Sequence, residues 1–300
     1  MIAHFSSFQL KLQNVLVATD FSAASKRAVV YATAMARRHG SKLFVAHVVA
    51  SGSESALMEG WRAGQSEITE HLLANRLDGI QYELIVRSGD IWRVLSKLIS
   101  EREIDLVVVG TRGRTGVRKF ILGSVAESIF RQAPCPVLTV GPGSAGQDPE
   151  VAPERILTAT GFAPHSIFGM RCAIGFARDL RSSVALLHVI AGKSELSEDA
   201  KNKARDEGLT KLRALFSREL RLASEPVFLV EFGSVPEKIL EVAASWGANL
   251  IVLGLHHVPE ASKDETTFAK AYEIVSKASC PVLTVRAPDE VGENSYNDAA

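Results

Sequence analysis

Residues 126–140 read AESIFRQAPCPVLTV, and residues 271–285 read AYEIVSKASCPVLTV. Nine of these fifteen positions are identical, including the whole CPVLTV run. A second pair of segments agrees with the first, since NVLVATDFSAAS at 14–25 resembles RILTATGFAPHS at 155–166. A repeat of this length decides the number of domains before any other feature of the chain. We therefore expect the 300 residues to form two copies of one domain.

Each copy alternates short apolar runs with longer helical patterns. The first is expected to hold strands at about 14–19, 42–49, 81–87, 105–110 and 136–140, and helices at about 22–39, 54–78, 90–102 and 123–132. The second is expected to hold strands near 155–160, 183–190, 226–232, 249–254 and 281–285. Runs such as LVVVG and LIVLG are apolar on both faces, as buried parallel strands are. The pattern predicts an α/β protein built of βαβ units, with a helix-covered parallel sheet in each copy.

The boundaries of the copies follow from the composition between and after them. Gly, Pro and small polar residues indicate a linker over 143–153, and polar residues indicate a flexible tail over 287–300. The first domain is then expected over 1–142 and the second over 154–286.

Composition excludes several classes of function. The chain holds 34 Lys+Arg and 34 Asp+Glu, so its net charge favours neither a nucleic acid nor an anionic membrane as partner. No apolar stretch approaches the roughly 20 residues that span a bilayer. The three cysteines are too few and too far apart for a disulfide framework or a zinc site. We therefore expect a cytoplasmic protein with neither a nucleic-acid nor a membrane partner.

The zero net charge divides unevenly between the halves. Residues 1–150 hold 17 Lys+Arg and 14 Asp+Glu, a net charge of +3, and residues 151–300 hold 17 and 20, a net charge of −3. Part of the positive excess lies in residues 110–124, GTRGRTGVRKFILGS, where Arg112, Arg114, Arg118 and Lys119 stand without an acidic residue.

This glycine-rich segment leaves a buried strand and leads into a helix. Glycines let backbone amides approach an anion closely, and a helix N-terminus adds unpaired N–H groups with a favourable dipole. The segment thus has the features of a polyphosphate site. The alternative is a solvated surface loop in which the glycines only allow turns.

The spacing Gly110-x2-Gly113-x9-Gly123-Ser124 resembles the nucleotide-binding signature of the universal stress protein family. VATDFSAAS at 17–25 and AHVV at 46–49 resemble that family's first strand with its turn and the end of its second strand. The resemblance covers nearly all of both halves and matches the tandem, two-domain form of the family.

The resemblance implies two tandem doubly wound domains, each a five-stranded parallel sheet in the order 3-2-1-4-5 with a ligand crevice where the order reverses. It implies that Asp20 and the backbone of Val48 hold the adenosine end of ATP. The phosphates would lie on Gly110, Gly113, Gly123, Ser124 and Val125, with Arg112 and Arg114 adding charge. Whether Mg²⁺ accompanies ATP is left open. For Asp20 the alternative is a turn or N-cap residue at the start of the first helix.

The second copy lacks most of this signature. Gly161 stands in the place of Asp20, His257 in that of Gly113, and Phe268-Ala269 in that of Gly123-Ser124. Residues 255–270 carry a net charge of −1, against +4 for the first glycine-rich loop. We therefore expect one nucleotide site per chain, in the first half.

Residues for catalysis are scarce near this loop. Asp20 is the only acid that the sequence places in the crevice, and efficient phosphoryl transfer needs a metal-holding acid and a group that positions the nucleophile. We expect a regulatory ATP-binding switch in stress response that acts on an unknown protein partner, with at most slow ATP hydrolysis.

Two alternatives remain. A nucleotide-independent interaction or scaffold protein would use the same fold, with its two domains pairing through their CPVLTV edge strands and with a homodimer left open. An adenosine-nucleotide α-hydrolase is less well supported, because VATDFSAAS lacks the paired glycines of that phosphate loop.

Other conspicuous side chains are interpreted structurally. Cys135 and Cys280 occupy equivalent positions before a strand and are expected to pack rather than react. His47 and His188 are also repeat-equivalent and are expected to cap or pack at the end of the second strand. His256-His257 is expected to be a solvated pair, since zinc normally takes three or four ligands.

Overall fold

The computed structural model describes residues 12–49, 54–74, 79–111, 122–192, 197–216, 222–256 and 265–287. The chain divides into two compact units between Val151 and Ala152. Among the described residues, no helix is long and apolar enough to cross a membrane.

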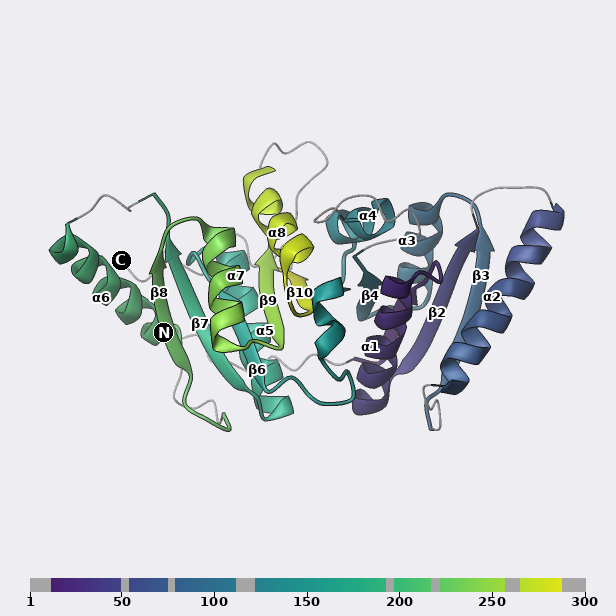
Figure 1. The fold of residues 1–300 in the computed structure, drawn as a ribbon, viewed down its shortest axis with the longest axis horizontal. Helices are drawn as coiled ribbons and strands as arrows, with labels where there is room; N and C mark the ends of the chain where they lie inside the picture. Colours follow the sequence, from purple (N-terminus) through teal and green to yellow (C-terminus); the bar gives the residue numbers. More distant parts are fainter. Residues whose placement is uncertain are drawn as a thin grey trace. The chain divides into compact units, whose positions relative to one another are not determined.

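The described residues of the first unit form a parallel sheet of five strands flanked by four α-helices (Figure 1). Its strands are β1 (Asn14–Ala18), β2 (Lys42–Val49), β3 (Tyr82–Ser88), β4 (Leu106–Gly110) and β5 (Val137–Val140). Its helices are α1 (Ala23–His39), α2 (Glu54–Ala74), α3 (Ile91–Glu101) and α4 (Ser124–Gln132). The strand order is β3-β2-β1-β4-β5, and each neighbouring pair is parallel.

The second unit repeats this arrangement, with five strands and four α-helices in the part that the structure describes. Its strands are β6 (Arg155–Ala159), β7 (Ser183–Ile190), β8 (Val227–Phe232), β9 (Leu250–Leu255) and β10 (Val282–Arg286). Its helices are α5 (Pro164–Leu180), α6 (Glu198–Ala214), α7 (Val235–Trp246) and α8 (Glu265–Lys277). The order β8-β7-β6-β9-β10, again all parallel, is the order 3-2-1-4-5 that the resemblance implies, which confirms the predicted fold.

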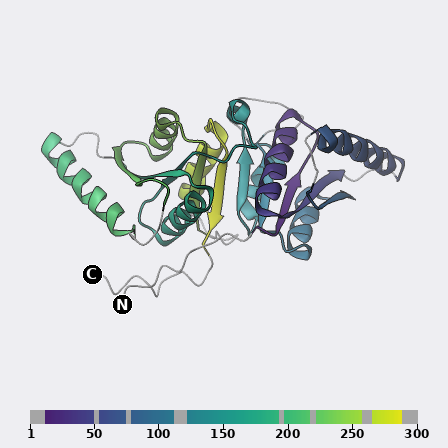
Figure 2. The same ribbon diagram turned by 90° about the horizontal axis from the view of Figure 1, so that it is seen from below.

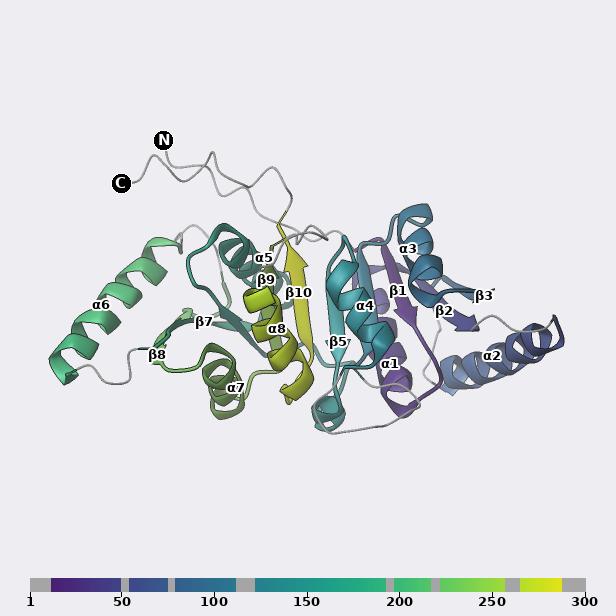
Figure 3. The ribbon, with the colours of Figure 1, turned by 90° about the horizontal axis from the view of Figure 1, so that it is seen from above.

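Helices cover both faces of each sheet. In the first unit α1 packs on β1 and β4, while α3 and α4 contact each other on the opposite face (Figure 3). In the second unit α5 packs on β6 and β9, and α7 contacts α8 (Figure 2). The strands read as continuous apolar runs because both of their faces are covered. In β4, LVVVG, every residue is buried.

Polar side chains at the amino ends of the strands are duplicated together with the fold. Asp105, before β4, accepts hydrogen bonds from the backbone amides of Gln13 and Asn14 at 2.7 and 2.8 Å. Asn249, before β9, accepts from the amides of Glu154 and Arg155 at 3.1 and 3.0 Å. Each side chain aligns the start of the central strand of its sheet with the strand beside it.

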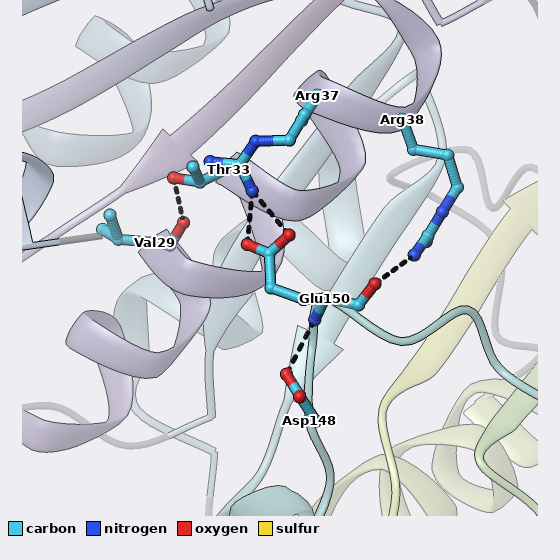
Figure 4. Close-up of polar contacts among 6 residues, drawn as sticks. All are labelled: Val29, Thr33, Arg37, Arg38, Asp148 and Glu150. Atoms are coloured by element: carbon cyan, nitrogen blue, oxygen red, sulfur yellow. Dashed lines mark hydrogen bonds and ion pairs between the residues drawn. The ribbon is translucent and has the colours of Figure 1, made fainter. Parts of the chain in front are cut away.

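The segment after β5, where the sequence suggests a linker, packs on the first unit. Residues Pro142–Gly146 form a 3₁₀ turn, and Glu150 then reaches α1. The Glu150 carboxylate accepts hydrogen bonds from Arg37, and its carbonyl oxygen accepts one from Arg38 at 3.0 Å (Figure 4). The first compact unit therefore extends to Val151.

The strands expected from the sequence agree with the observed bounds to within about one residue. The agreement reflects the strength of the apolar signal in strands that are buried on both faces. Of the expected helix at 54–78, residues 75–78 lie outside the described part of the chain, as does the tail from 288 onward.

Candidate functional site

The candidate site lies where the strand order of the first sheet reverses. Strand β1 pairs with β2 on one side and with β4 on the other, all in the same direction. The chain leaves β1 toward α1 on one face and leaves β4 toward α4 on the opposite face. The two connections diverge, so the carboxyl ends of β1 and β4 border a crevice, which is where ligands bind in open α/β sheets.

The turn after β1 has a constrained backbone conformation. Phe21 has a φ of +64°, which non-glycine residues rarely adopt. Its amide donates to the Thr19 hydroxyl at 3.1 Å, and that hydroxyl donates to the Ser25 hydroxyl at 3.1 Å. Ser22 then caps α1 by accepting a hydrogen bond from the amide of Ser25 at 3.2 Å. These hydrogen bonds hold the turn in a conformation that the sequence alone does not favour.

Asp20 stands at the front of this turn, at the edge of the crevice. Its Oδ1 accepts a hydrogen bond from the amide of Ser22 at 3.0 Å, and its side chain is only half-buried. The sequence left two roles open, ligand contact or helix start. In the structure Ser22 caps α1, and Asp20 accepts a hydrogen bond that stabilises the turn.

His47, near the end of β2, supports the turn from behind. Its Nδ1 lies 2.8 Å from the carbonyl oxygen of Thr19, and its ring packs on that of Phe21 with 4.5 Å between centroids. The expectation that this histidine packs at the end of its strand agrees with these contacts. Val48 follows it and lies half-buried at the end of β2, two residues past the level of Ala18 in β1.

Gly110 ends β4, and its contacts are with protein backbone. A Cβ on this residue would lie 2.6 Å from the carbonyl carbon of Ala24 and 2.8 Å from the amide nitrogen of Ser25. Such distances are far below van der Waals contact. The glycine is therefore required for the first turn of α1 to lie on the end of β4, whether or not a ligand binds.

The two ends of the glycine-rich loop lie side by side. The amide of Gly123 donates to the carbonyl oxygen of Thr111 at 2.9 Å, which brings the start of α4 to the end of β4. Gly123 is the N-cap of α4 and, as a glycine, has no side chain with which to cap the helix. The first-turn amides of α4, at Ser124 and Val125, therefore have no intrahelical partner. An anion is the natural partner for such a helix end.

The rest of the predicted phosphate cradle, Arg112, Gly113 and Arg114, lies outside the described residues, as do Arg118 and Lys119. The structure thus brings Asp20, Gly110 and the start of α4 to one edge of the sheet. The Arg-rich stretch is attached to that edge at both ends, through Thr111 and Gly123.

A hollow of about 180 Å³ lies beside the start of α4. Its lining includes Ser124 and Val125 of α4 together with Asp90 and Trp92 at the start of α3. Asp90 is a second acid at this edge of the sheet, beside Ser124 and Val125, that the sequence did not place there. The connection after β3 ends at the same edge of the sheet, and a Gly-Asp pair before an apolar helix is a recognisable N-cap signal. Asp90 indeed caps α3, accepting from the amide of Arg93 at 2.8 Å.

The second half keeps the turn framework without the acid. Phe162 has a φ of +68°, its amide donates to the Thr160 hydroxyl at 3.0 Å, and Thr160 and Ser166 share a hydrogen bond of 3.0 Å. His188 repeats the role of His47, with its Nδ1 2.9 Å from the carbonyl oxygen of Thr160 and its ring on Phe162. Gly161 replaces Asp20, and Ala163 replaces Ser22 as the N-cap of the following helix, without a side-chain hydrogen bond. The shared part of the turn is therefore structural.

Gly254, the counterpart of Gly110, shows the same close packing. A Cβ on Gly254 would fall 1.9 Å from the carbonyl oxygen of His165, in the first turn of α5. The second half thus keeps this glycine although it has lost the other glycines of the signature. Its retention indicates that the first glycine of the signature serves helix packing in both halves.

The largest difference between the halves is where the last helix begins. By the repeat, Ser124 corresponds to Ala269, but α8 already begins at Glu265, four residues earlier. Ala269 and Lys270 therefore lie inside a helix, where their amides bond to carbonyl groups one turn back. The sequence predicted the loss of the anion site from missing glycines and acidic charge. The structure shows in addition that α8 begins about one turn earlier than α4 does, which places its N-terminal end about 6 Å further back along the helix axis.

The remaining candidates have structural roles. Burial raises the pKa of the Cys172 and Cys280 thiols to about 12, so neither is a nucleophile at neutral pH. His256 packs its ring on that of His165, with 5.2 Å between centroids, and His257 lies outside the described residues. Among the residues that the structure describes, no group of three metal-binding side chains comes together.

Comparisons with known proteins agree with this architecture. The model of the universal stress protein family matches residues 11–141 and again residues 153–286. A protein of Staphylococcus haemolyticus (strain JCSC1435) named as a universal stress protein is 34% identical over 157 residues, covering 48% of this chain and 94% of that protein.

Two crystal structures of whole-length neighbours share the fold. A universal stress protein from Archaeoglobus fulgidus DSM 4304 aligns with 92% of this chain and 99% of its own, with a TM-score of 0.69 and 18% identity. A protein from Pseudomonas aeruginosa UCBPP-PA14, named as a universal stress protein, aligns with 94% of this chain and 95% of its own, with a TM-score of 0.60 and 16% identity.

Proposed function

Because the chain belongs to the universal stress protein family, in tandem form, we propose that its first half binds one adenine nucleotide, with ATP as the reference ligand. The second half binds none. Nucleotide binding serves as a regulatory switch in stress response, read by a protein partner. The observation that carries the proposal is the uncapped start of α4, held at the end of β4 by the hydrogen bond from Gly123 to Thr111.

The phosphates would lie on the amides of Gly123, Ser124 and Val125. Backbone N–H groups and the helix dipole attract anions there without a side chain. The hydroxyl of Ser124, an exposed residue beside the hollow, adds a further donor. Arg112 and Arg114, attached to the same edge through Thr111, would supply positive charge.

The adenosine would lie toward β1 and β2. Asp20 is half-buried at the end of β1, and its carboxylate can accept hydrogen bonds from ribose hydroxyl groups. The backbone of Val48, at the end of β2, offers a donor and an acceptor for the base. The fixed turn at Phe21 keeps Asp20 at one place, which limits the entropy lost on binding.

Binding rather than turnover suits the groups at this edge. Both carboxylates of the crevice, Asp20 and Asp90, accept hydrogen bonds from backbone amides at helix starts. Mg²⁺ bound with ATP would take its ligands mainly from phosphate oxygens and water, as this ion commonly does. Efficient phosphoryl transfer would need a further group to position the nucleophile.

Stoichiometry of ATP binding tests the proposal directly. Native mass spectrometry and calorimetric titration of the nucleotide-stripped full chain should give one ATP per chain. Gly123→Val should abolish binding, because its side chain would crowd the amides that face the phosphates. The backbone of Gly123, with φ −62°, accepts valine. Phe268→Val, the equivalent change in the second half, is the matched control and should leave one ATP bound.

Three results would contradict the proposal. Two ATP per chain with similar affinity would show that the second half binds as well. No ATP in the wild-type chain would favour a nucleotide-independent interaction protein, and unchanged binding by the Gly123→Val variant would show that the phosphates do not lie on the start of α4. The switch has its own test, since saturating ATP should change the rate of trypsin cleavage at Arg112 and Arg114.

A further inference from the structure

The second half carries a hollow of its own at the carboxyl ends of β6 and β9. It encloses about 190 Å³ between the turn after β6, the start of α7 and the inner side of α8. This is the position of the crevice in the first half, but its lining is different. The difference in lining decides what the hollow can hold.

Most of the wall is aliphatic. It includes Val189, Val235, Ile239, Leu253 and Ile274. The hydroxyl groups of Thr160 and Ser166 also reach the hollow, but they bond to each other at 3.0 Å, and Ser166 donates to the carbonyl oxygen of Ala163 at 2.8 Å. Their hydrogen-bonding capacity is therefore largely used within the turn.

The charge that the described residues bring to the lining is positive. Lys270 is exposed at the hollow, and none of the lining residues that the structure describes is a carboxylate. Lys270 stands at the place of Val125 in the first half, and Gly161 stands at that of Asp20. Glu273, one turn along α8 from Lys270, forms its ion pair with Lys277 at 2.7 Å. Two of the replacements at this crevice thus remove an anion and add a cation.

Space is available where the acid was lost. A Cβ on Gly161 would meet no atom within 4 Å, and its backbone does not require glycine. An engineered apolar cavity of about 150 Å³ holds benzene. A hollow of 190 Å³ is therefore large enough for one ring or a short branched chain with a small polar group.

We propose that this hollow binds a small apolar carboxylate, of the size of a single aromatic ring bearing one acid group. The ring lies against the aliphatic side chains of α7 and α8, and the carboxylate faces Lys270. The site is independent of the nucleotide site, because it uses none of the residues of the first half. The tandem chain then senses two ligands of different chemistry through one duplicated fold.

Benzoate, with neutral benzamide as its matched control, tests the proposal on the full chain. Calorimetry and ligand-detected NMR should show benzoate binding at least about threefold more tightly than benzamide, the range of an exposed ion pair. Lys270→Gln should lower the affinity for benzoate by about threefold to fivefold and leave the affinity for benzamide unchanged. Gly161→Asp should weaken benzoate by about tenfold, because it places a second carboxylate at the mouth.

Asparagine has the shape of aspartate without its charge. Gly161→Asn therefore separates the effect of charge repulsion from the effect of added side-chain bulk. It should weaken benzoate less than Gly161→Asp does, with an unchanged unfolding temperature. Equal affinity for benzoate and benzamide, or equal loss in the Asp and Asn variants, would overturn the assignment of an anion. Benzoate binding that is unaffected by both Lys270→Gln and Gly161→Asp, or absent at millimolar concentration, would overturn the site itself.

Discussion

In the first half α4 begins at Ser124 with its amides uncapped, whereas in the second half α8 begins at Glu265, four residues before the equivalent position. Around this difference the two halves agree closely. The same threonine, phenylalanine, serine and histidine hold the turn after the first strand, and the same glycine lets the next helix lie on the sheet. Duplication thus preserved this framework, whereas the start of the last helix, the acid after the first strand and the N-cap serine of the first helix changed.

The comparison teaches which parts of a binding signature are structural. Gly110 belongs to the nucleotide signature, yet Gly254 persists in a half where the rest of that signature is gone. Packing explains both glycines, because each meets the first turn of a helix. Gly123 and Ser124 have no such counterpart, since Phe268 and Ala269 replace them inside a longer helix.

The largest expected contrast concerns the equivalent cysteines Cys135 and Cys280. Cys135 is half-buried, and Cys280 is buried with a pKa of about 12. At pH 8 the thiolate fraction of Cys280 is on the order of 10⁻⁴, against a few tenths for an ordinary thiol. Iodoacetamide should alkylate Cys280 at least about a hundredfold more slowly than Cys135, measured by peptide mass spectrometry. In urea the two rates should converge, and equal rates in the native chain would contradict the buried position of Cys280.

Gly110→Ala and Gly254→Ala sharpen the structural half of the comparison. Each should lower the free energy of unfolding by about 2 kcal/mol or more, because the added methyl group meets backbone that cannot move away. Urea unfolding measures the loss, and hydrogen exchange by mass spectrometry assigns it to one half. Gly161→Ala, where a Cβ meets open space, should leave stability unchanged. A loss of stability in the Gly110→Ala variant alone would show that packing does not require a glycine at position 254.

Thr19→Val and Thr160→Val probe the turn that the halves share. Each removes a hydroxyl that accepts from a phenylalanine amide and bonds a serine hydroxyl. The expected cost is about 1–2 kcal/mol in either half, since a buried amide loses its partner. Thr210→Val, on the exposed side of α6, is the control and should cost less. A large cost in only one half would break the symmetry of the framework.

The smallest expected effect is a difference between the halves in how their stability depends on pH. The Lys42 ammonium, through its hydrogen bond, and then the charge of Arg102 hold the pKa of Glu83 below its ordinary value of 4.5. Val227 stands at the equivalent place in the second half. The lowered pKa stabilises the fold above the unfolded-state pKa, and this contribution is lost as the pH falls through the folded-state value.

Glu83→Gln should therefore cost about 0.5 kcal/mol at pH 7, because the ion pairs are partly exposed. The cost should shrink at low pH, as the pH falls through the lowered folded-state pKa of Glu83 and the wild-type carboxyl group becomes protonated. Urea unfolding at the two pH values measures the difference. An equal cost at both would show that the hydrogen bonds of Glu83, rather than its charge, stabilise the first half.

The sequence by itself determined the duplicated domain, the bounds of the strands and the place of the glycine-rich loop. It could do so because strands buried on both faces leave an unbroken apolar signal, and because a repeat supports each assignment twice. It also located Asp20 and Ser124, which lie at connections that a parallel sheet must bring to one edge.

Only the tertiary structure decided what these connections do. The left-handed backbone at Phe21, the packing of Gly254 on α5 and the presence of Asp90 beside Ser124 arise from contacts between residues distant in sequence. The early start of α8 likewise cannot be predicted from the loss of glycines in the sequence. A helix end depends on which amides find partners, and the hollow near Lys270 depends on which side chains surround it. Neither is a property of local sequence.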